Sequence, residues 1–261
     1  MRLGELRHDD GRYALRGWLA RRLAQPQHDA AVALIEEAGT LHHALLLHGL
    51  SRLRAGNGFT LADQHGDLIA RSSRLLEPFV YEAVDAVIPP TGAVRLLEIG
   101  CGSGTYIRRA VALNARLTAV GLELQPVVAE QARENLRAWG LAERVTVEVG
   151  DVRARSADPS FDVATLHNNI YYFPVAERPQ LLAHVRGFLG PGGRLLITTA
   201  CHGGRAEADM LNVWAALTDG CGRLPAAEEL ERQLRAAGYA NVRSRRLIPG
   251  QAYYAFVAET V

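Results

Sequence analysis

From residue 91 to the C-terminus, short apolar runs alternate with longer segments of helical periodicity. The runs VRLLEI, RLTAVGLEL, RVTVEVG, FDVATLH and RLLITTA have the length and composition of buried strands. Helices are predicted for TYIRRAVAL, PVVAEQARENLRAWG, EELERQLRAAG and VAERPQLLAHVRGFLG, the last ending at Gly190 and the turn PGG. Two closing strands, ANVRSRRLI and AYYAFVAE, follow. This alternation predicts a doubly wound α/β fold, in which a mostly parallel sheet is covered by helices on both faces.

The chain has a different pattern before Pro89. Residues 28–53 carry Ala and Leu at helical spacing, a Gly-rich break follows at 55–58, and a second helical stretch runs over 61–88. Pro78 is expected to kink or divide that stretch. We therefore expect a smaller N-terminal helical domain in residues 1–88 and the α/β domain in residues 89–261.

Composition narrows the functional classes. The 29 basic and 28 acidic residues give a formal net charge of +1 and are interspersed, which argues against a nucleic-acid partner. The charged start lacks a signal peptide's apolar core, and unbroken apolar runs such as ALLLHGL fall far short of the ~20 residues that span a bilayer. Three irregularly spaced cysteines predict neither disulfides nor a metal site. We expect a cytoplasmic protein without a membrane partner.

The segment LLEIGCGSGT is the sharpest chemical feature of the chain. Its glycines permit a tight turn between strand and helix and let a ligand approach the main chain; they are Gly100, Gly102 and Gly104. The end of this strand borders the ligand crevice of an open α/β sheet. A dinucleotide fingerprint would need a third glycine where Thr105 stands, and Glu98 would repel a pyrophosphate. Glu98 instead favours a cationic ligand such as S-adenosylmethionine (SAM), which carries an ammonium and a sulfonium.

Two further acids follow the next two strands. Glu123 closes the second strand, where a carboxylate can accept hydrogen bonds from ribose hydroxyls. Asp151 follows the third strand and is expected to face the adenine amino group. Lone acids at strand ends also serve as helix caps or solvated turns. We expect the neighbouring side chains of Cys101, Leu124 and Val152 to complete the cofactor lining.

Together, E-x-G-x-G-x-G, the acid of the second strand, the G-D after the third and the late PGG turn resemble the class I SAM-dependent methyltransferases over residues 90–261. The resemblance implies a seven-stranded sheet with an antiparallel last strand. It also implies SAM as cofactor and S-adenosylhomocysteine (SAH) as product, with the glycines along the methionine part, Glu123 at the ribose and Asp151 at the adenine.

The fourth strand and its exit, FDVATLHNNIYYFP, should face the transferred methyl group. Methyl transfer from a sulfonium is a direct displacement that needs no metal, only alignment and, for some acceptors, a base. His167 is the candidate base because histidine titrates near neutral pH; the alternative is a histidine that, like Asn168, positions the cofactor. Tyr171 and Tyr172 are expected to shape the acceptor pocket, although either could belong to the core.

The N-terminal segment resembles that of small-molecule O-methyltransferases. SRLRAGNGFTLADQHG matches their L-R-x-G-x-x-F…H-G stretch, and HDDGRYALRGWLARRL resembles the wing of a winged-helix module. In those families this domain forms the dimer and closes over the acceptor, and LHNN would overlay their Leu-His-Asp segment, whose histidine is the base. The resemblance thus implies a homodimer, although a helical lid without a dimer role is the alternative. Candidate acceptor contacts here are Phe59, His65, and Ser72 or Ser73.

After the fifth strand, His202 and Trp214 lie where an acceptor pocket would be completed, although packing alone would also explain them. We therefore predict an enzyme that transfers methyl from SAM to a small molecule, foremost at oxygen. The alternative is a SAM-binding protein of the same fold without methyl transfer. A nicotinamide-dependent oxidoreductase is disfavoured by Glu98 and Thr105.

Overall fold

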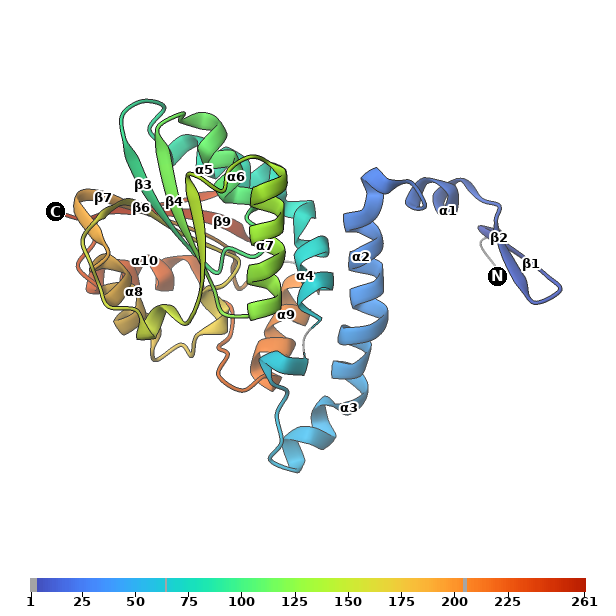
Figure 1. Cartoon of the computed structure of the whole chain (residues 1–261). Helices are drawn as coiled ribbons and strands as arrows, with labels where there is room; N and C mark the ends of the chain where they lie inside the picture. The colour runs from blue at the N-terminus through green and yellow to red at the C-terminus, as the bar shows by residue number, and fades with distance from the viewer. Residues whose placement is uncertain (1–3, 64, 204–205) are drawn as a thin grey trace.

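The computed structural model describes residues 4–63, 65–203 and 206–261, and its larger part is a seven-stranded sheet between two layers of helices (Figure 1). The strand order is β5-β4-β3-β6-β7-β9-β8, and β9 alone runs antiparallel to its neighbours. The strands are β3 (Val94–Ile99), β4 (Leu117–Glu123), β5 (Val145–Val149), β6 (Phe161–His167), β7 (Leu189–Ala200), β8 (Ala240–Arg246) and β9 (Tyr253–Glu259). The predicted α/β fold, with seven strands and an antiparallel last strand, is confirmed.

Helices cover both faces of this sheet because each buried strand sends alternate side chains to opposite sides. In β3, Leu96 packs into the layer formed with α5, α6 and α7, while Leu97 packs into the opposite layer with α8 and α10. The bounds are α5 (Glu77–Val87), α6 (Thr105–Leu113), α7 (Pro126–Ala138), α8 (Arg178–Arg186) and α10 (Ala227–Ala236). The sheet therefore carries two hydrophobic cores, one on each face.

One predicted boundary was wrong. The helix expected to reach Gly190 ends at Arg186, and β7 already begins at Leu189. Leu189 pairs with Phe161 of β6, so this segment gains strand hydrogen bonds that a longer helix would forgo. The PGG sequence lies inside β7, where Gly192 has φ +72° and the pairing register with β6 shifts before the regular ladder resumes.

The N-terminal part begins with a hairpin and continues as a long helical run (Figure 1). The hairpin turns at Asp10 and Gly11, both with positive φ, as two-residue hairpin turns require. Its elements are β1 (Leu6–Asp9), β2 (Arg12–Leu15), α1 (Trp18–Leu23), a 3-10 turn (Pro26–His28), α2 (Asp29–Glu37), a π-helical turn (Ala38–His42) and α3 (His43–Arg54). The helix predicted over 28–53 and the break after it are confirmed.

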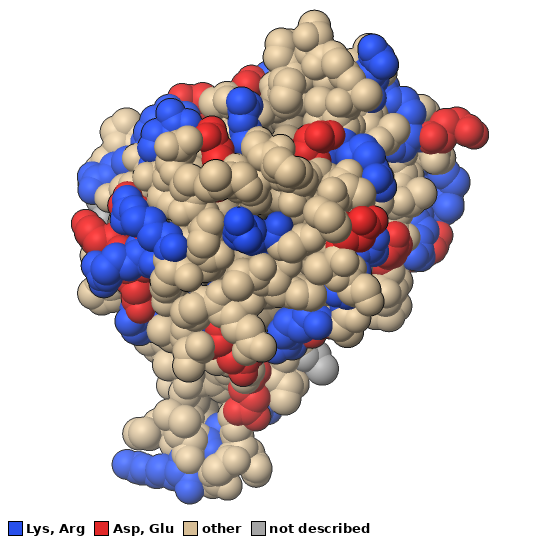
Figure 2. All heavy atoms as spheres, turned by 90° about the vertical axis from the view of Figure 1, so that its left-hand side faces the viewer, with Lys and Arg blue, Asp and Glu red and all other residues tan. Residues whose placement is uncertain are grey.

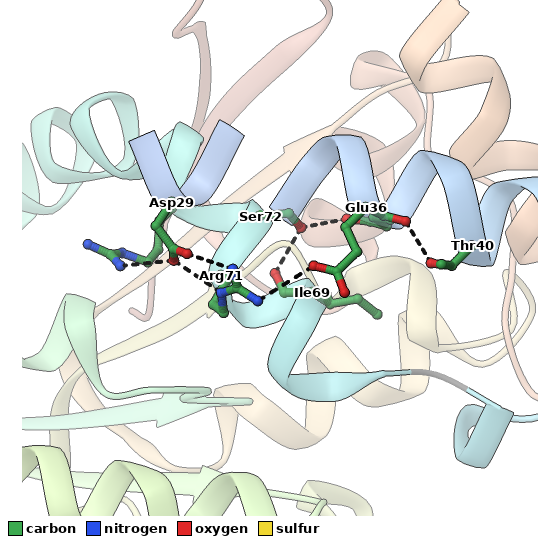
Figure 3. Close-up of polar contacts among 8 residues, drawn as sticks. Asp29, Glu36, Thr40, Ile69, Arg71 and Ser72 are labelled. Carbon is green, nitrogen blue, oxygen red and sulfur yellow. Dashed lines mark hydrogen bonds and ion pairs between the residues drawn. The ribbon is translucent and has the colours of Figure 1, made fainter. Parts of the chain in front are cut away.

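The second N-terminal stretch is divided, as predicted, with Pro78 in the first turn of α5. It comprises a 3-10 turn (Leu61–Asp63), α4 (Gly66–Ser72), a 3-10 turn (Ser73–Leu76) and then α5. Polar contacts join α4 to α2 (Figure 3): Arg71 donates to both carboxylate oxygens of Asp29 at 2.6 and 3.1 Å, and Ser72 donates to Glu37 at 2.5 Å. Helix α2 is thus fixed to α4.

The domain division at residue 88 stays a prediction. Helix α5, placed in the N-terminal domain by the sequence, contributes Val80, Val84 and Val87 to the core on one face of the sheet. Helix α9 (Ala206–Leu217), from the C-terminal half, lies beside α3, where the backbone of Gly49 closely approaches Leu217. A helix from each part therefore packs against the other part: α5 against the sheet, and α9 against α3.

The surface of the helical run Pro26–Arg54 is unusually apolar. It is long and apolar enough to cross a membrane by length and composition, and only 11% of its apolar window is buried. Unbroken apolar runs in the sequence do not indicate this apolar character, because single polar residues interrupt the helical run. Core helices and signal sequences of other proteins pass the same test, so the observation is weak for membrane insertion. On the face drawn in Figure 2, basic and acidic side chains are interspersed.

Candidate functional site

A cavity of about 260 Å³ opens at the carboxyl ends of β3, β4, β5 and β6. This is the edge where parallel α/β sheets bind ligands. Its wall also includes residues of α4 and the turn after it, notably Ile69 and Ser73. The N-terminal part thus forms one side of the cavity through α4, and the sheet forms the other. Helix α4 is in turn hydrogen-bonded to α2.

The glycine loop supplies a bare stretch of main chain to this cavity. Gly100, Gly102 and Gly104 have φ of +67°, +53° and +80°, a region that other residues rarely adopt. The amides of Gly100 and Cys101 donate to the Leu122 carbonyl at 2.7 and 3.0 Å, which holds the loop against β4. A Cβ added to Gly102 would meet no atom of the described chain within 4 Å. Gly104 caps α6 and lies outside the cavity lining described.

Glu123 lies on the cavity wall at the end of β4, as the sequence predicted for the acid of the second strand. Its Oε2 accepts a hydrogen bond from the Gly102 amide, and its Oε1 accepts one from the Gln125 amide, both at 3.0 Å. Leu124 lines the cavity beside it. The carboxylate is therefore positioned by main-chain donors and keeps lone pairs for a ligand.

Asp151 and Val152 line the cavity after β5, and an arginine that the sequence analysis missed joins them. The Arg153 guanidinium donates to Asp151 Oδ2 at 2.6 Å, and its amide donates to Oδ1 at 2.9 Å. These bonds hold the pKa of Asp151 below its usual range. Arg153 also pairs with Glu177 at 3.3 Å. The sequence around this turn has no periodic pattern that would indicate a contact between Arg153 and Asp151.

Glu98 lies deeper in the structure than the sequence analysis expected. Its side chain is 1% exposed and is not among the described cavity residues, so it lies behind the glycine loop, not at the cavity entrance. Burial raises its pKa well above the usual range, and the neighbouring Thr165 only partly opposes this. Burial thus favours the uncharged form of this carboxyl, and its side chain does not reach the cavity lining.

His167 and Asn168 line the cavity at the end of β6. His167 Nδ1 lies 2.8 Å from Thr198 Oγ1, and the Tyr106 ring packs against the imidazole with centroids 4.6 Å apart. Its Nε2 is buried without a hydrogen-bond partner among the described residues. Burial lowers the pKa of His167 from 6.5 to about 3, so the ring is neutral at physiological pH.

Asn169 is a cavity residue that the predicted cofactor set omitted. Its Nδ2 donates to the Ile99 carbonyl at the start of the glycine loop. Its Oδ1 is buried and has no hydrogen-bond partner within the described chain. An unpaired buried acceptor is costly, so this atom is suited to a donor group of a ligand.

The predicted acceptor residues divide into two groups. Tyr171 and Tyr172 line the cavity, whereas Trp214 stands behind them, with ring centroids 6.2 and 5.4 Å away. Trp214 is 4% exposed, and His202 is exposed on the loop after β7; neither belongs to the described lining. Among the N-terminal candidates Ser73 lines the cavity, whereas Phe59, His65 and Ser72 do not belong to the lining described. Substrate roles for all of them stay predictions.

With the glycine loop, the strand-end acids and the strand order described, the chain can be compared with known proteins. Residues 97–195 match the family model of a methyltransferase domain. Over these residues the chain is similar to methyltransferase domains, and its fold is that of solved methyltransferase structures. A structure called PigF with SAH covers 99% of this chain and 82% of its own, with a TM-score of 0.79 and 19% identity. An O-methyltransferase family protein from Burkholderia thailandensis has a TM-score of 0.76, 22% identity and coverage of 99% and 80%.

Curated proteins similar to this chain include demethylspheroidene O-methyltransferases. The protein from Rhodobacter capsulatus is 27% identical over 72% of this chain and 46% of its own length. That from Cereibacter sphaeroides is 28% identical over 74% of this chain and 52% of its own. The chain therefore spans about half the length of the curated relatives it matches.

Proposed function

We propose that this chain is a SAM-dependent methyltransferase that methylates a hydroxyl oxygen of a small molecule. The observation that carries the proposal is the joined unit of glycine loop and strand-end acid. Gly102 presents bare main chain to the cavity, and its amide fixes Glu123 at 3.0 Å. Such a unit can hold an amino-acid tail and a ribose without any phosphate-binding group.

The residues present fit SAM. The methionine part would lie along Gly100 and Gly102, with its ammonium donating to the unpaired Asn169 Oδ1. Glu123 would accept from the ribose hydroxyls. The adenine would lie between Leu124 and Val152, and Asp151 keeps lone pairs for its amino group beside Arg153. When bound, SAM supplies an activated methyl group on sulfur, and SAH is its product.

Aromatic and apolar side chains form the other part of the cavity, which supports a flat, largely apolar acceptor. Tyr106, Tyr171 and Tyr172 come from the sheet domain, and Ile69 and Ser73 come from the N-terminal part. Aromatic faces also suit a sulfonium cation. Transfer to oxygen is supported by the names of relatives, among them the demethylspheroidene O-methyltransferases and a mitomycin 7-O-methyltransferase structure.

His167 is the base of this proposal. A neutral imidazole with a free Nε2 can take the proton of an acceptor hydroxyl as the methyl group arrives. One observation favours the alternative of SAM binding without methyl transfer: among the described residues, Nδ1 is paired with a threonine hydroxyl instead of a carboxylate. A threonine hydroxyl stabilises the imidazolium cation less than a carboxylate would. His167 is therefore suited to an acceptor whose hydroxyl group is itself acidic.

We further propose a cytoplasmic homodimer formed through α2 and α3. Leu46, Leu50 and Leu53 lie on one face of α3 and are 65%, 61% and 53% exposed. The charged side of α2 is occupied by its bonds to α4, so insertion of this helix into a bilayer would cost those bonds. On the face drawn in Figure 2, basic side chains are interspersed with acidic ones, whereas nucleic-acid binders concentrate basic residues in a patch or stripe.

A methyl-transfer assay tests the proposal. The purified chain is incubated with SAM and a panel of hydroxylated aromatic compounds, and products are followed by mass spectrometry together with SAH formation. We expect a mass gain of one methylene unit on at least one phenolic acceptor, with equal release of SAH. SAM binding without methylation of any acceptor would support the alternative, and absence of SAM binding would contradict both.

A further inference from the structure

A histidine on helix α8 is hydrogen-bonded to the turn that follows β5. His184 Nε2 lies 3.0 Å from the carbonyl oxygen of Val152 and 3.0 Å from that of Arg155. These carbonyls belong to the 3-10 turn Val152–Ala154 and to the residue directly after it. The Val152 side chain and the apolar face of α8 also share one hydrophobic core. The turn is therefore attached to α8 by packing and by hydrogen bonds.

The same turn carries the part of the cavity wall that we propose for adenine. Asp151, Val152 and Arg153 all line the cavity. Asp151 begins the turn and accepts a hydrogen bond from the Arg153 amide at 2.9 Å, so a shift of the turn would move this carboxylate with it. His184 itself does not belong to the cavity lining described. Its influence on a ligand must therefore pass through the turn.

The place of β5 in the sheet explains why this turn needs support. Strand β5 lies at the edge of the sheet and pairs with β4 on one side only. The start of the turn is held to β4 by the Gly150 amide, which donates to the Glu123 carbonyl at 2.9 Å. The ion pair of Arg153 with Glu177 is half-exposed at 3.3 Å, and such a pair contributes little. The partly buried bonds from His184 are thus the stronger attachment of the far end of the turn.

The direction of the histidine bonds follows from their partners. A main-chain carbonyl oxygen can only accept, so His184 Nε2 must carry a proton. In a neutral imidazole, Nδ1 is then the nitrogen without a proton. The ring also packs edge-on against the fully buried Phe188, with ring centroids 5.1 Å apart. Packing and hydrogen bonds together fix the place of the imidazole and its tautomer.

We infer that His184 is a positioning residue, which acts through the main chain of Val152 and Arg155 to hold Asp151 where it can accept from the adenine amino group. Without this donor, each of the two carbonyls loses a hydrogen bond and the turn is free to shift. The role towards adenine rests on the proposed function, whereas the tautomer of His184 is a property of the folded chain alone.

Nuclear magnetic resonance tests the hydrogen bonds without any ligand. Long-range ¹H–¹⁵N correlation of histidine-labelled protein shows which ring nitrogen carries a proton, and the His184 signals are those lost in His184→Gln among nine histidines. We expect a proton on Nε2 in the wild type. An unprotonated Nε2 would overturn the inference, because its lone pair would then face two carbonyl oxygens.

A pair of ligands separates positioning from general support of the fold. SAH carries the adenine amino group, and an SAH analogue with unsubstituted purine lacks it. By calorimetry, the wild type should bind SAH about ten-fold more tightly than the analogue, as expected for a hydrogen bond to a charged acceptor. In His184→Leu this ratio should fall towards one. In His184→Gln, whose side-chain amide can still donate, most of the ratio should remain.

The controls keep the outcomes distinct. Circular dichroism checks that each variant is folded, and His184→Asn, with a shorter amide, replaces His184→Leu if the latter does not fold. His8→Leu, at an exposed histidine of the N-terminal hairpin, should leave the ratio unchanged. Equal losses for both ligands in His184→Leu, or a wild type that does not prefer SAH, would overturn the inference. A wild type that binds neither ligand would contradict the proposed function and the inference with it.

Discussion

The main-chain amide of Gly102 donates a hydrogen bond to Oε2 of Glu123, 3.0 Å away, so the glycine loop and the end of β4 form one unit. The amide of Gln125 holds the other carboxylate oxygen at the same distance. A carboxylate offers about four lone-pair sites, so two remain after these bonds. The loop thus orients the acid before any ligand arrives, which lowers the ordering cost of binding.

Glu123→Gln should weaken SAH binding by about 10–100-fold, because the charged acceptor for the ribose is lost and a charge-assisted hydrogen bond contributes roughly 1.5–3 kcal/mol. Isothermal titration calorimetry measures the change. Glu143→Gln, at an exposed acid outside the cavity lining, serves as the matched control. Equal affinities for the two variants would show that Glu123 does not contact the ligand.

Gly102→Val should abolish SAH binding in a protein that still folds. The new side chain would project from the loop into open space beside the cavity, at a φ of +53° that a β-branched residue resists. Gly92→Val imposes a similar strain at φ +87°, also with no described atom within 4 Å, but outside the cavity lining. We expect similar losses of Tm and a loss of binding only at Gly102. Retained affinity in Gly102→Val would place the ligand elsewhere.

Asn169→Ala should discriminate between two ligands. SAH carries the ammonium that we place at Asn169 Oδ1, whereas 5′-methylthioadenosine lacks the amino-acid tail. The substitution should therefore weaken SAH by about ten-fold, as expected for a hydrogen bond to a charged group, and leave methylthioadenosine unchanged. Equal losses for both ligands would indicate that Asn169 only supports the loop through its bond to Ile99.

Burial of His167 predicts a pH dependence of stability. Its pKa falls from 6.5 to about 3 on folding, so between these values the unfolded chain binds a proton that the folded one does not. The free energy of unfolding should therefore fall as pH is lowered from about 6.5 towards 3, with a contribution of up to about 1.4 kcal/mol per pH unit. Urea unfolding of wild type and His167→Gln isolates this term. A stability difference that stays constant between pH 7 and 4 would contradict it.

The exposed leucines of α3 predict the assembly. A double variant, Leu46→Glu with Leu50→Glu, should shift the protein from dimer to monomer in light scattering with its circular dichroism unchanged. Val127→Glu is the control, because this residue is 83% exposed on α7, outside the two helices of the proposed interface. A wild-type monomer, or a dimer that survives the double variant, would refute the proposed interface.

The sheet and the loop could be predicted from sequence because their causes are local. Apolar runs predict strands β3 to β6. The glycines of the loop predict a tight turn, and all three of them adopt positive φ. The depth of Glu98 could not be predicted, since it depends on how the loop folds over β3. The partners of Asp151 and His167, namely Arg153 and Thr198, were also missed. A salt bridge across a turn and a contact between strands leave no periodic signal.

Calorimetric titration of the intact chain with SAM and with NAD⁺ tests the central claim most directly. Binding at the unit of Gly102 and Glu123 predicts saturable heat with SAM at one site per chain, displacement by SAH, and none of this heat in Gly102→Val. It predicts no binding of NAD⁺. Saturable heat with NAD⁺ and none with SAM would contradict the account.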